Sequence, residues 1–322
     1  MYLIRFDMRA PEHGAPTTEL YPAALEMSAW GEKNGCVVVV VSEHHCSPDG
    51  YLPSPLIFAT AVAAKTDSIL INVAALILPL YDPIKAAEDM AVLDILSKGR
   101  VSYVLGMGYR DEEYAMFGVD RRRRAKQLEA NIEALQKAFT GEPFEFEGRP
   151  VHVTPKPVTP GGPSLALGGG SLIAARRAAR FGLDLLASGA TPGLEEAYRE
   201  ESARVGREPG YCRVPDGAPT TVFVAEDLDR AWERIGPYLL HDAKTYGAWL
   251  KGQDTTTKSG AQTIDDLRAE QGPYRIVTVA EAAELIRNHG ILSLQPLCGG
   301  APPEIGWETM KLVAGKVLPS LT

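Results

Sequence analysis

Residues 69–108, ILINVAALILPLYDPIKAAEDMAVLDILSKGRVSYVLGMG, carry the pattern that decides the fold. An apolar, strand-like run lies at each end of this stretch, and the segment between the two runs has apolar residues at helical spacing. Asp82 is suited to cap the N-terminus of that helix. Pro83 occupies the first helical position, where the N–H group that proline lacks would have no helical partner, and Gly99 ends the helix. A strand, a helix and a second strand in this order predict a parallel βαβ unit.

The same alternation of short strands and longer helices runs along the whole chain. The other strand-like runs lie at 3–7, 36–42, 163–170, 183–188, 220–225 and 291–297. About eight strand and helix units in one chain favour a (β/α)8 barrel over a doubly wound sheet. We therefore predict an α/β fold, a TIM barrel with insertions, and a single domain over residues 1–322, because no composition break marks a linker. The polar stretch 241–275 shows no clear strand and is long enough to be a lid.

The charge balance disfavours polyanionic partners. The 322 residues contain 33 Lys and Arg against 41 Asp and Glu, a net charge of −8. A chain of this charge repels nucleic acid and anionic membrane surfaces.

The four cysteines of the chain lack CxxC spacing. The chain has neither a basic and apolar leader nor an apolar run of the roughly 18 residues that a membrane span needs. We expect a cytoplasmic protein with reduced thiols and no nucleic-acid or membrane partner.

A glycine-rich turn is the most mechanistic signal in the chain. In a barrel the active site lies at the C-terminal ends of the strands, so residues just after each strand are site candidates. Gly168, Gly169 and Gly170 end one strand, and Ser171 begins the next helix. Small backbone units let a ligand approach there, and the N–H groups and dipole of the helix favour an anion such as phosphate. The alternative is that Ser171 only caps the helix and the glycines only form a tight turn.

Two adjacent histidines, His44 and His45, come after Glu43 at the end of the second strand. Consecutive side chains of a strand point to opposite faces, so the two imidazoles are not expected to bind one metal ion, and we predict no metal site. One of the histidines would face the barrel lumen. There it would either move a proton near neutral pH or serve as a hydrogen-bonded structural residue.

Three of these segments, taken together, resemble the luciferase-like flavin monooxygenase family, a group of (β/α)8 oxidoreductases that use FMN or coenzyme F420. The segments are VSEHH at 41–45, VAALILPLYDPIKAAEDMAVLDILSKGR at 73–100 and PSLALGGGSLIAARRAARFGLD at 163–184. The resemblance covers nearly the whole chain. It implies a luciferase-like barrel, and it agrees with the phosphate interpretation of the glycine-rich turn.

The resemblance also implies a set of cofactor-binding residues. They are Ala74, Ala75, Met107, Gly108, Gly169, Gly170 and Ser171. The family's flavin phosphate site falls on the last three, and its non-prolyl cis peptide, which supports the flavin ring, falls at or beside Ala74–Ala75. His44 matches the histidine that lies near the reactive part of the flavin and is the catalytic residue that we predict. The end of the fourth strand is often basic in luciferases, whereas Met107 in this chain offers the phosphate no charge.

The activity implied by the resemblance is that of a monooxygenase that uses reduced FMN and O2 on a small organic substrate. A separate flavin reductase would supply the reduced FMN. The family commonly forms homodimers through the helices after strands two and three, which would place Glu88 near the interface.

Three alternatives remain open at this point. The first is an F420-dependent oxidoreductase that transfers hydride without oxygen chemistry. The second is a flavin-binding barrel without catalytic activity, because cofactor residues can persist without a substrate pocket. The third is a glycosidase-type barrel with paired carboxylates, for which Glu43 offers one carboxylate and no strand end offers a convincing second.

Overall fold

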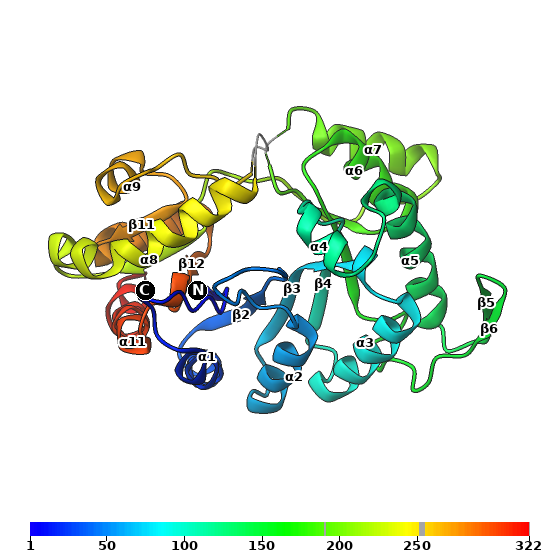
Figure 1. Cartoon of the computed structure of the whole chain (residues 1–322), viewed down its shortest axis with the longest axis horizontal. Helices are drawn as coiled ribbons and strands as arrows, with labels where there is room; N and C mark the ends of the chain where they lie inside the picture. The colour runs from blue at the N-terminus through cyan, green and yellow to red at the C-terminus, as the bar shows by residue number, and fades with distance from the viewer. Residues whose placement is uncertain (190, 251–254, 322) are drawn as a thin grey trace. The chain divides into compact units, whose positions relative to one another are not determined.

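The computed structural model describes residues 1–189, 191–250 and 255–321. The chain divides into two units (Figure 1). The first unit comprises Met1–Val41, Ser47–Pro53 and Pro215–Thr322, and the second comprises Ser42–Cys46 and Ser54–Val214. The expectation of one domain over the whole chain stays a prediction.

The first unit is built on parallel strands in the order β11, β10, β12, β1, β2. The strands are β1 (Tyr2–Phe6), β2 (Cys36–Val41), β10 (Thr221–Val224), β11 (Tyr274–Val277) and β12 (Leu292–Leu294). The helices are α1 (Thr17–Glu32), α8 (Leu228–Trp249), α9 (Ile264–Glu270), α10 (Val279–His289) and α11 (Pro303–Leu312), with shorter turns η3 (Cys298–Gly300), η4 (Val313–Val317) and η5 (Leu318–Leu321). In β1, Tyr2, Ile4 and Phe6 are buried while the side chains between them are only half-buried, as alternation in a strand requires.

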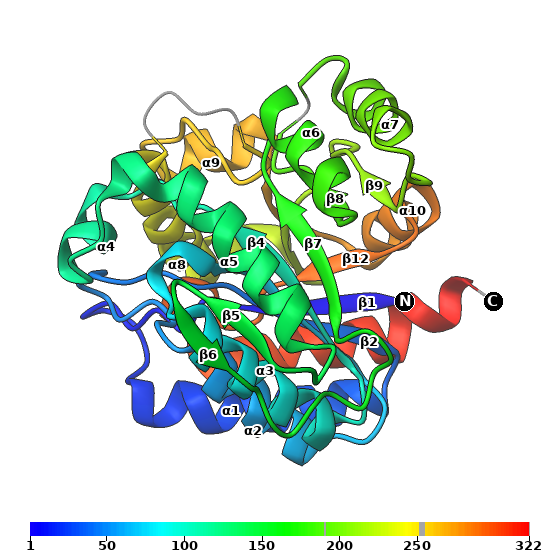
Figure 2. The same cartoon turned by 90° about the vertical axis from the view of Figure 1, so that its right-hand side faces the viewer.

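The second unit also has a parallel sheet, in the order β3, β4, β7, β8, β9. These strands are β3 (Leu70–Ile77), β4 (Val101–Gly106), β7 (Ser164–Gly168), β8 (Asp184–Leu186) and β9 (Cys212–Arg213), and β5 (Phe144–Phe146) and β6 (Arg149–Val151) form a separate antiparallel hairpin. The helices are α2 (Pro55–Lys65), α3 (Pro83–Ser97), α4 (Asp111–Met116), α5 (Arg124–Ala138), α6 (Leu172–Phe181) and α7 (Leu194–Arg204), with η1 (Leu78–Leu80) and η2 (Arg121–Arg123). Helices α6 and α7 pack against each other (Figure 2).

Helix α3 begins and ends where the sequence predicts. The Asp82 side chain accepts hydrogen bonds from the N–H groups of Ile84 (2.8 Å) and Lys85 (3.2 Å), and Pro83 comes next. At the other end, Lys98 already adopts a left-handed conformation and Gly99 continues it with φ +78°. Two residues in the left-handed conformation therefore end the helix, and Gly99 adopts this conformation without steric cost.

The expectation that residues 241–275 contain no strand is wrong, and the segment also contains helical residues that the sequence pattern did not indicate. Helix α8 continues through Trp249, because the buried side chains Leu239, Ala243 and Tyr246 extend its apolar stripe. Farther along, α9 is helical and Tyr274–Val277 forms the strand β11, which pairs in parallel with β10. The sequence pattern hid this strand because it is four residues long and comes after a polar stretch. Residues 251–254 of the expected lid lie outside the described residues, and a lid role for the segment stays a prediction.

Within the described residues, no helix combines the length and the apolar character needed to cross a bilayer.

Candidate functional site

Residues 42–46 of the second unit are fastened to the C-terminal part of strand β3. The Ser42 hydroxyl donates a hydrogen bond to the carbonyl oxygen of Ala74 (2.7 Å). The Glu43 carboxylate accepts one from the backbone N–H of Ile77 (2.7 Å). These two hydrogen bonds hold the two residues before His44 against β3, so the histidine is held at the edge of the sheet where barrel enzymes place their catalytic groups.

His44 forms a buried pair with Glu113 of α4. Its Nδ1 lies 2.9 Å from Glu113 Oε1, and the histidine is 7% exposed whereas the glutamate is fully buried. The Tyr109 hydroxyl lies 3.3 Å from the other ring nitrogen, Nε2. A carboxylate at Nδ1 favours the proton on that nitrogen and leaves Nε2 as the acceptor. The pair therefore fixes both the orientation and the tautomer of the His44 imidazole.

Glu113 is ionised despite its burial. Burial raises the pKa of this carboxyl group, but the hydrogen bonds from His44 and from the His45 backbone N–H (3.0 Å), together with the positive charge of Arg110, bring it below its ordinary value. Stabilisation of a buried charge by several donors is the usual way in which proteins retain one. The negative charge that orients His44 is thus present throughout the neutral pH range.

His45 faces a different carboxylate. Its Nε2 lies 2.8 Å from Glu43 Oε1, and its ring contacts the ring of Phe117 edge-on at a centroid distance of 4.7 Å. Glu43 also accepts a hydrogen bond from the Tyr81 hydroxyl (2.8 Å), and burial together with this carboxylate raises the pKa of Tyr81. The two imidazoles thus serve separate networks, as alternation along an extended chain predicts.

Small residues line the ends of strands β3 and β4. The Ala74–Ala75 peptide bond is cis, as the family resemblance implies. A Cβ atom on Gly106 would lie 2.9 Å from Ala75 Cβ, and one on Gly108, whose φ is +67°, would lie 2.8 Å from Ile77 Cγ2. Glycine is therefore required at both positions, because any side chain would clash with the neighbouring strand. Met107, between them, is half-buried, and its carbonyl oxygen accepts a hydrogen bond from the Tyr114 hydroxyl.

The glycine-rich turn joins β7 to α6. Gly169 has φ +150°, and a Cβ atom there would lie 2.8 Å from Ala174 Cβ, so the turn packs tightly against the helix. The Ser171 side chain accepts a hydrogen bond from the Ala174 N–H (3.2 Å) and thereby caps α6. The capping interpretation of Ser171 is confirmed. It is compatible with an anion at the same turn, because a cap satisfies one of the four N–H groups that a helix start leaves without helical partners.

Most of the predicted site residues of the second unit lie at the C-terminal ends of adjacent strands or in the loops that directly continue from them, and Ala74 and Ala75 lie in the C-terminal half of β3. Strands β3, β4 and β7 are parallel neighbours, so the ends of all three meet at one edge of the sheet. This edge carries Ala74, Ala75, Met107, Gly108, Gly169, Gly170 and Ser171, and the bonds of Ser42 and Glu43 hold His44 next to it. No sequence pattern pointed to Glu113, because it lies in a six-residue helix that has too few turns to show a period.

A second buried network surrounds Arg9 in the first unit. The guanidinium is fully buried, with Nη1 2.7 Å from Asp49 Oδ2 and Nε 2.6 Å from Asp242 Oδ1. It also stacks over the rings of Tyr51 (4.7 Å) and Trp249 (4.5 Å). Two carboxylates and aromatic faces compensate the cost of removing this charge from water. Arg9 therefore ties the loop after β1 to the last turns of α8.

Asp7 lies beside this network and belongs to a group of possible metal ligands. Burial and the nearby Asp242 carboxylate raise the pKa of Asp7 to about 6, with Arg9 opposing the shift. One oxygen each of Asp7 and Asp242 and the Cys298 sulfur all lie within 4.8 Å of one another. Both oxygens of Asp7 accept hydrogen bonds, however, from the N–H of Arg9, the Gln295 side chain and the Gly299 N–H. With a guanidinium already bound, this group suits a fixed arginine better than a metal ion.

The chain belongs to the luciferase-like monooxygenase family, whose model matches residues 4–292. Among its relatives, the uncharacterized protein y4wF of Sinorhizobium fredii is 30% identical over 137 residues, which is 42% of this chain and 40% of that protein. The alkanal monooxygenase alpha chain of Photorhabdus laumondii is 26% identical over 176 residues, 53% of this chain and 49% of the relative. The oxygenase component of a flavin-dependent trigonelline monooxygenase from Acinetobacter baylyi is 26% identical over 132 residues, 40% and 36% of the two chains. The matched segments thus span half or less of each relative's length.

Solved structures extend the similarity to the full chain. The monooxygenase RslO1 from Streptomyces bottropensis aligns with a TM-score of 0.80 at 21% identity, covering 100% of both chains. The oxygenating constituent of 3,6-diketocamphane monooxygenase from Pseudomonas putida, solved with FMN, gives 0.70 at 18% identity over 100% and 99% of the two chains. The coenzyme F420 dependent tetrahydromethanopterin reductase from Methanopyrus kandleri gives 0.65 at 15% identity over 100% and 99%. These likenesses and the family match confirm the predicted α/β fold of the luciferase-like barrel enzymes, a family of flavin-dependent oxidoreductases.

The Arg9 network leads to a prediction for the stability of the first unit. Burial alone would raise the pKa of Asp49, but the hydrogen bond from His241 (2.7 Å) and the charge of Arg9 hold it well below its usual range. The ionised form is therefore favoured by folding, and its contribution is present above about pH 4 and is lost as the pH falls below that value. We expect Asp49→Asn to lower the free energy of unfolding by about 1–3 kcal/mol at pH 7.

Urea denaturation at pH 7 and at pH 3.5 measures this effect, and the difference between variant and parent should shrink at the lower pH. Glu26→Gln, on an exposed position of α1, is the matched control and should leave stability unchanged within about 0.5 kcal/mol. Equal stability of Asp49→Asn and the parent at pH 7 would show that Arg9 does not need this carboxylate.

Proposed function

We propose that this chain is the oxygenase of a flavin-dependent monooxygenase, using reduced FMN and O2 to insert one oxygen atom into a small organic substrate. The observation that carries the proposal is the strand edge of the second unit: the glycine-rich turn follows β7, small residues lie on β3 and β4, and Ser42 and Glu43 hold the oriented His44 against β3. Membership of the luciferase-like family supports it. A separate flavin reductase would supply the reduced cofactor, as the name of the Acinetobacter relative, an oxygenase component, suggests.

The residues at this edge fit FMN. The turn Gly169–Ser171 opens the ten-residue helix α6, whose first N–H groups and positive dipole end suit the FMN phosphate. Ala74, Ala75 and Gly106 present only small side chains, which leaves room for a flat ring to approach the backbone. When bound, reduced FMN supplies the electrons for the activation of O2.

The contribution of the protein's own side chains centres on His44. Glu113 holds the proton on Nδ1, so Nε2 can accept a proton and later return it. The Tyr109 hydroxyl, 3.3 Å from Nε2, can carry that proton onward. His44 and Glu113 are both buried, which strengthens the hydrogen bond between them.

We also propose that the protein is a homodimer whose interface includes α2 and α3. These two helices pack against each other and leave apolar side chains outside: Ile57 on α2 is 74% exposed, and Val92 and Leu96 on α3 are 43% and 53% exposed. Val92 and Leu96 are one helical turn apart, and exposed apolar side chains on two packed helices are typical of a surface that another subunit covers. Glu88 of α3 is half-buried, which is consistent with the edge of such an interface.

The phosphate position is tested with Ser171→Asp. Aspartate is a good helix cap, so the variant should fold normally while its carboxylate repels the phosphate. We expect FMN binding, monitored by absorbance and flavin fluorescence, to weaken at least about tenfold while riboflavin, which lacks the phosphate, binds as before. Ser54→Asp, at the start of α2, is the matched control. Unweakened FMN binding by Ser171→Asp would move the anion site elsewhere.

The role of His44 is tested by turnover with a substrate that the wild-type protein oxygenates. We expect His44→Ala to lower turnover by about 100-fold or more while FMN affinity stays within a few fold, because the imidazole acts on protons rather than on the phosphate. Glu113→Gln keeps a polar partner at Nδ1 but removes the charge, and should lower turnover by about 10-fold to 100-fold. Product formation measured by mass spectrometry decides the matter, and full turnover by His44→Ala would end its assignment as the catalytic residue.

The dimer is tested with Leu96→Glu, which places a charge on the exposed face of α3. We expect this variant to be monomeric, because burial of an unpaired carboxylate in an apolar interface costs several kcal/mol. Ile173→Glu, at a residue of α6 that is 64% exposed, is the control and should remain dimeric. Light scattering after size-exclusion chromatography gives the mass, and a monomeric wild-type protein would contradict the proposal.

A further inference from the structure

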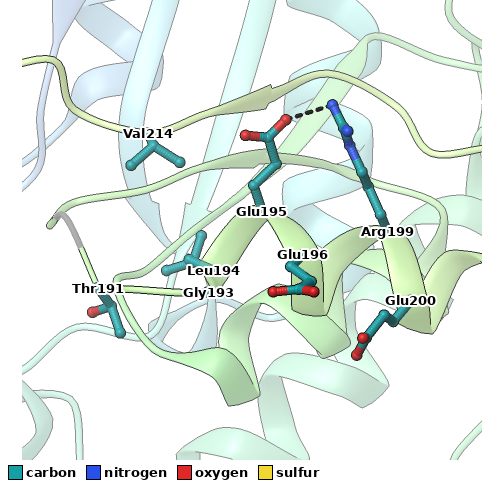
Figure 3. A pocket seen from close by; sticks show the side chains of 8 residues that line it. All are labelled: Thr191, Gly193, Leu194, Glu195, Glu196, Arg199, Glu200 and Val214. Atoms are coloured by element: carbon teal, nitrogen blue, oxygen red, sulfur yellow. Dashed lines mark hydrogen bonds and ion pairs between the residues drawn. The ribbon is translucent and has the colours of Figure 1, made fainter.

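A cavity of about 540 Å³ lies at the start of helix α7 (Figure 3). It is lined by Thr191, Gly193, Leu194, Glu195, Glu196, Arg199, Glu200 and Val214. All three glutamates and the arginine are exposed, and Arg199 forms an ion pair with Glu195 at 2.6 Å. Three carboxylates against one guanidinium leave the lining with a formal charge of −2.

One residue of the cavity lining contacts the turn of the proposed phosphate site. The Thr191 hydroxyl, part of its lining, donates a hydrogen bond to the carbonyl oxygen of Gly170. On the same side, a Cβ atom on Gly170 would lie 3.3 Å from the backbone nitrogen of Gly189, so the turn and the segment after β8 are in close contact. The lining of the cavity therefore adjoins the turn at which we place the phosphate.

The acidic residues also cancel the attraction that a helix start would exert on an anion. Glu195 and Glu196 occupy the first turn of α7, where carboxylates offset the positive end of the helix dipole. Glu200 lies one turn farther along. This contrasts with the first turn of α6, which contains no acidic residue. Of the two adjacent helix starts, only that of α6 is suited to hold negative charge.

The two candidate cofactors differ in the group attached to their phosphate. FMN ends in a phosphate monoester, whereas in coenzyme F420 the phosphate is a diester that continues into a lactyl group and a chain of γ-linked glutamates. Each tail residue adds a carboxylate. Like charges within a Debye length, about 8 Å at physiological salt, repel each other appreciably.

We propose that Glu195, Glu196 and Glu200 make this site selective for FMN, which ends at its phosphate. The same three carboxylates would reject coenzyme F420, which carries a glutamate tail. The inference rests on the proposed phosphate position at Gly169–Ser171. It assigns to the cavity a role in cofactor choice that is separate from the chemistry at His44. It also predicts that removing the charges of these three glutamates would allow F420 to bind.

The test compares the parent with the triple variant Glu195→Gln, Glu196→Gln, Glu200→Gln, in which the charges are removed and the size of the side chains is kept. Binding of FMN, riboflavin, F420 and the F420 headgroup without phosphate and tail is measured by fluorescence titration at low salt. The control variant is Glu133→Gln, Glu142→Gln, Glu145→Gln, which changes the net charge equally at exposed positions outside the cavity lining.

We expect the parent to bind F420 at least about tenfold more weakly than FMN, and the triple variant to bind F420 at least about tenfold more tightly than the parent does. FMN, riboflavin and the headgroup should bind both proteins equally within about threefold, and the control variant should behave as the parent. If FMN binds and Ser171→Asp weakens it, but the triple variant leaves F420 binding unchanged, the selectivity inference fails and the proposed function stands. If the parent does not bind FMN, both fail.

Discussion

The candidate site depends on the buried carboxylate of Glu113. One of its oxygens accepts hydrogen bonds from the His44 ring and the His45 backbone, and the guanidinium of Arg110 lies 3.4 Å away. Without this negative charge, the imidazole of His44 would lose the charged partner of its Nδ1, and the peptide after it would lose a charged partner in a region shielded from water. A single residue from a short helix thus organises both the chemistry and the backbone of the loop after β2.

In the second unit, the first turns of the neighbouring helices α6 and α7 differ in charge. The start of α6 combines glycines with a serine cap and carries no acidic side chain, whereas the start of α7 carries two glutamates. In the first unit a buried charge has a structural role. Arg9 is enclosed by carboxylates and aromatic rings, and its ion pairs hold the packed elements together.

The fold and the place of the glycine-rich turn in it could be predicted from the sequence because both are encoded locally. The cap at Asp82 and the stop at Gly99 are short-range signals, and the glycine-rich turn must lie between a strand and a helix. Glu113 could not be predicted because its partner in space, His44, is 69 residues away in sequence, and no local period links the two. Strand β11 escaped prediction because its pairing with β10, rather than its own four residues, defines it.

The proposed FMN site occupies one strand edge of the second unit, with the phosphate at the turn Gly169–Ser171. A crystal structure of the protein grown with FMN tests this placement most directly. We expect the phosphate within hydrogen-bond distance of the backbone N–H groups of this turn, with the flavin ring against Ala74–Ala75. A phosphate bound at any other helix start, or a turn filled by the protein's own side chains, would contradict the proposed site and leave only the fold.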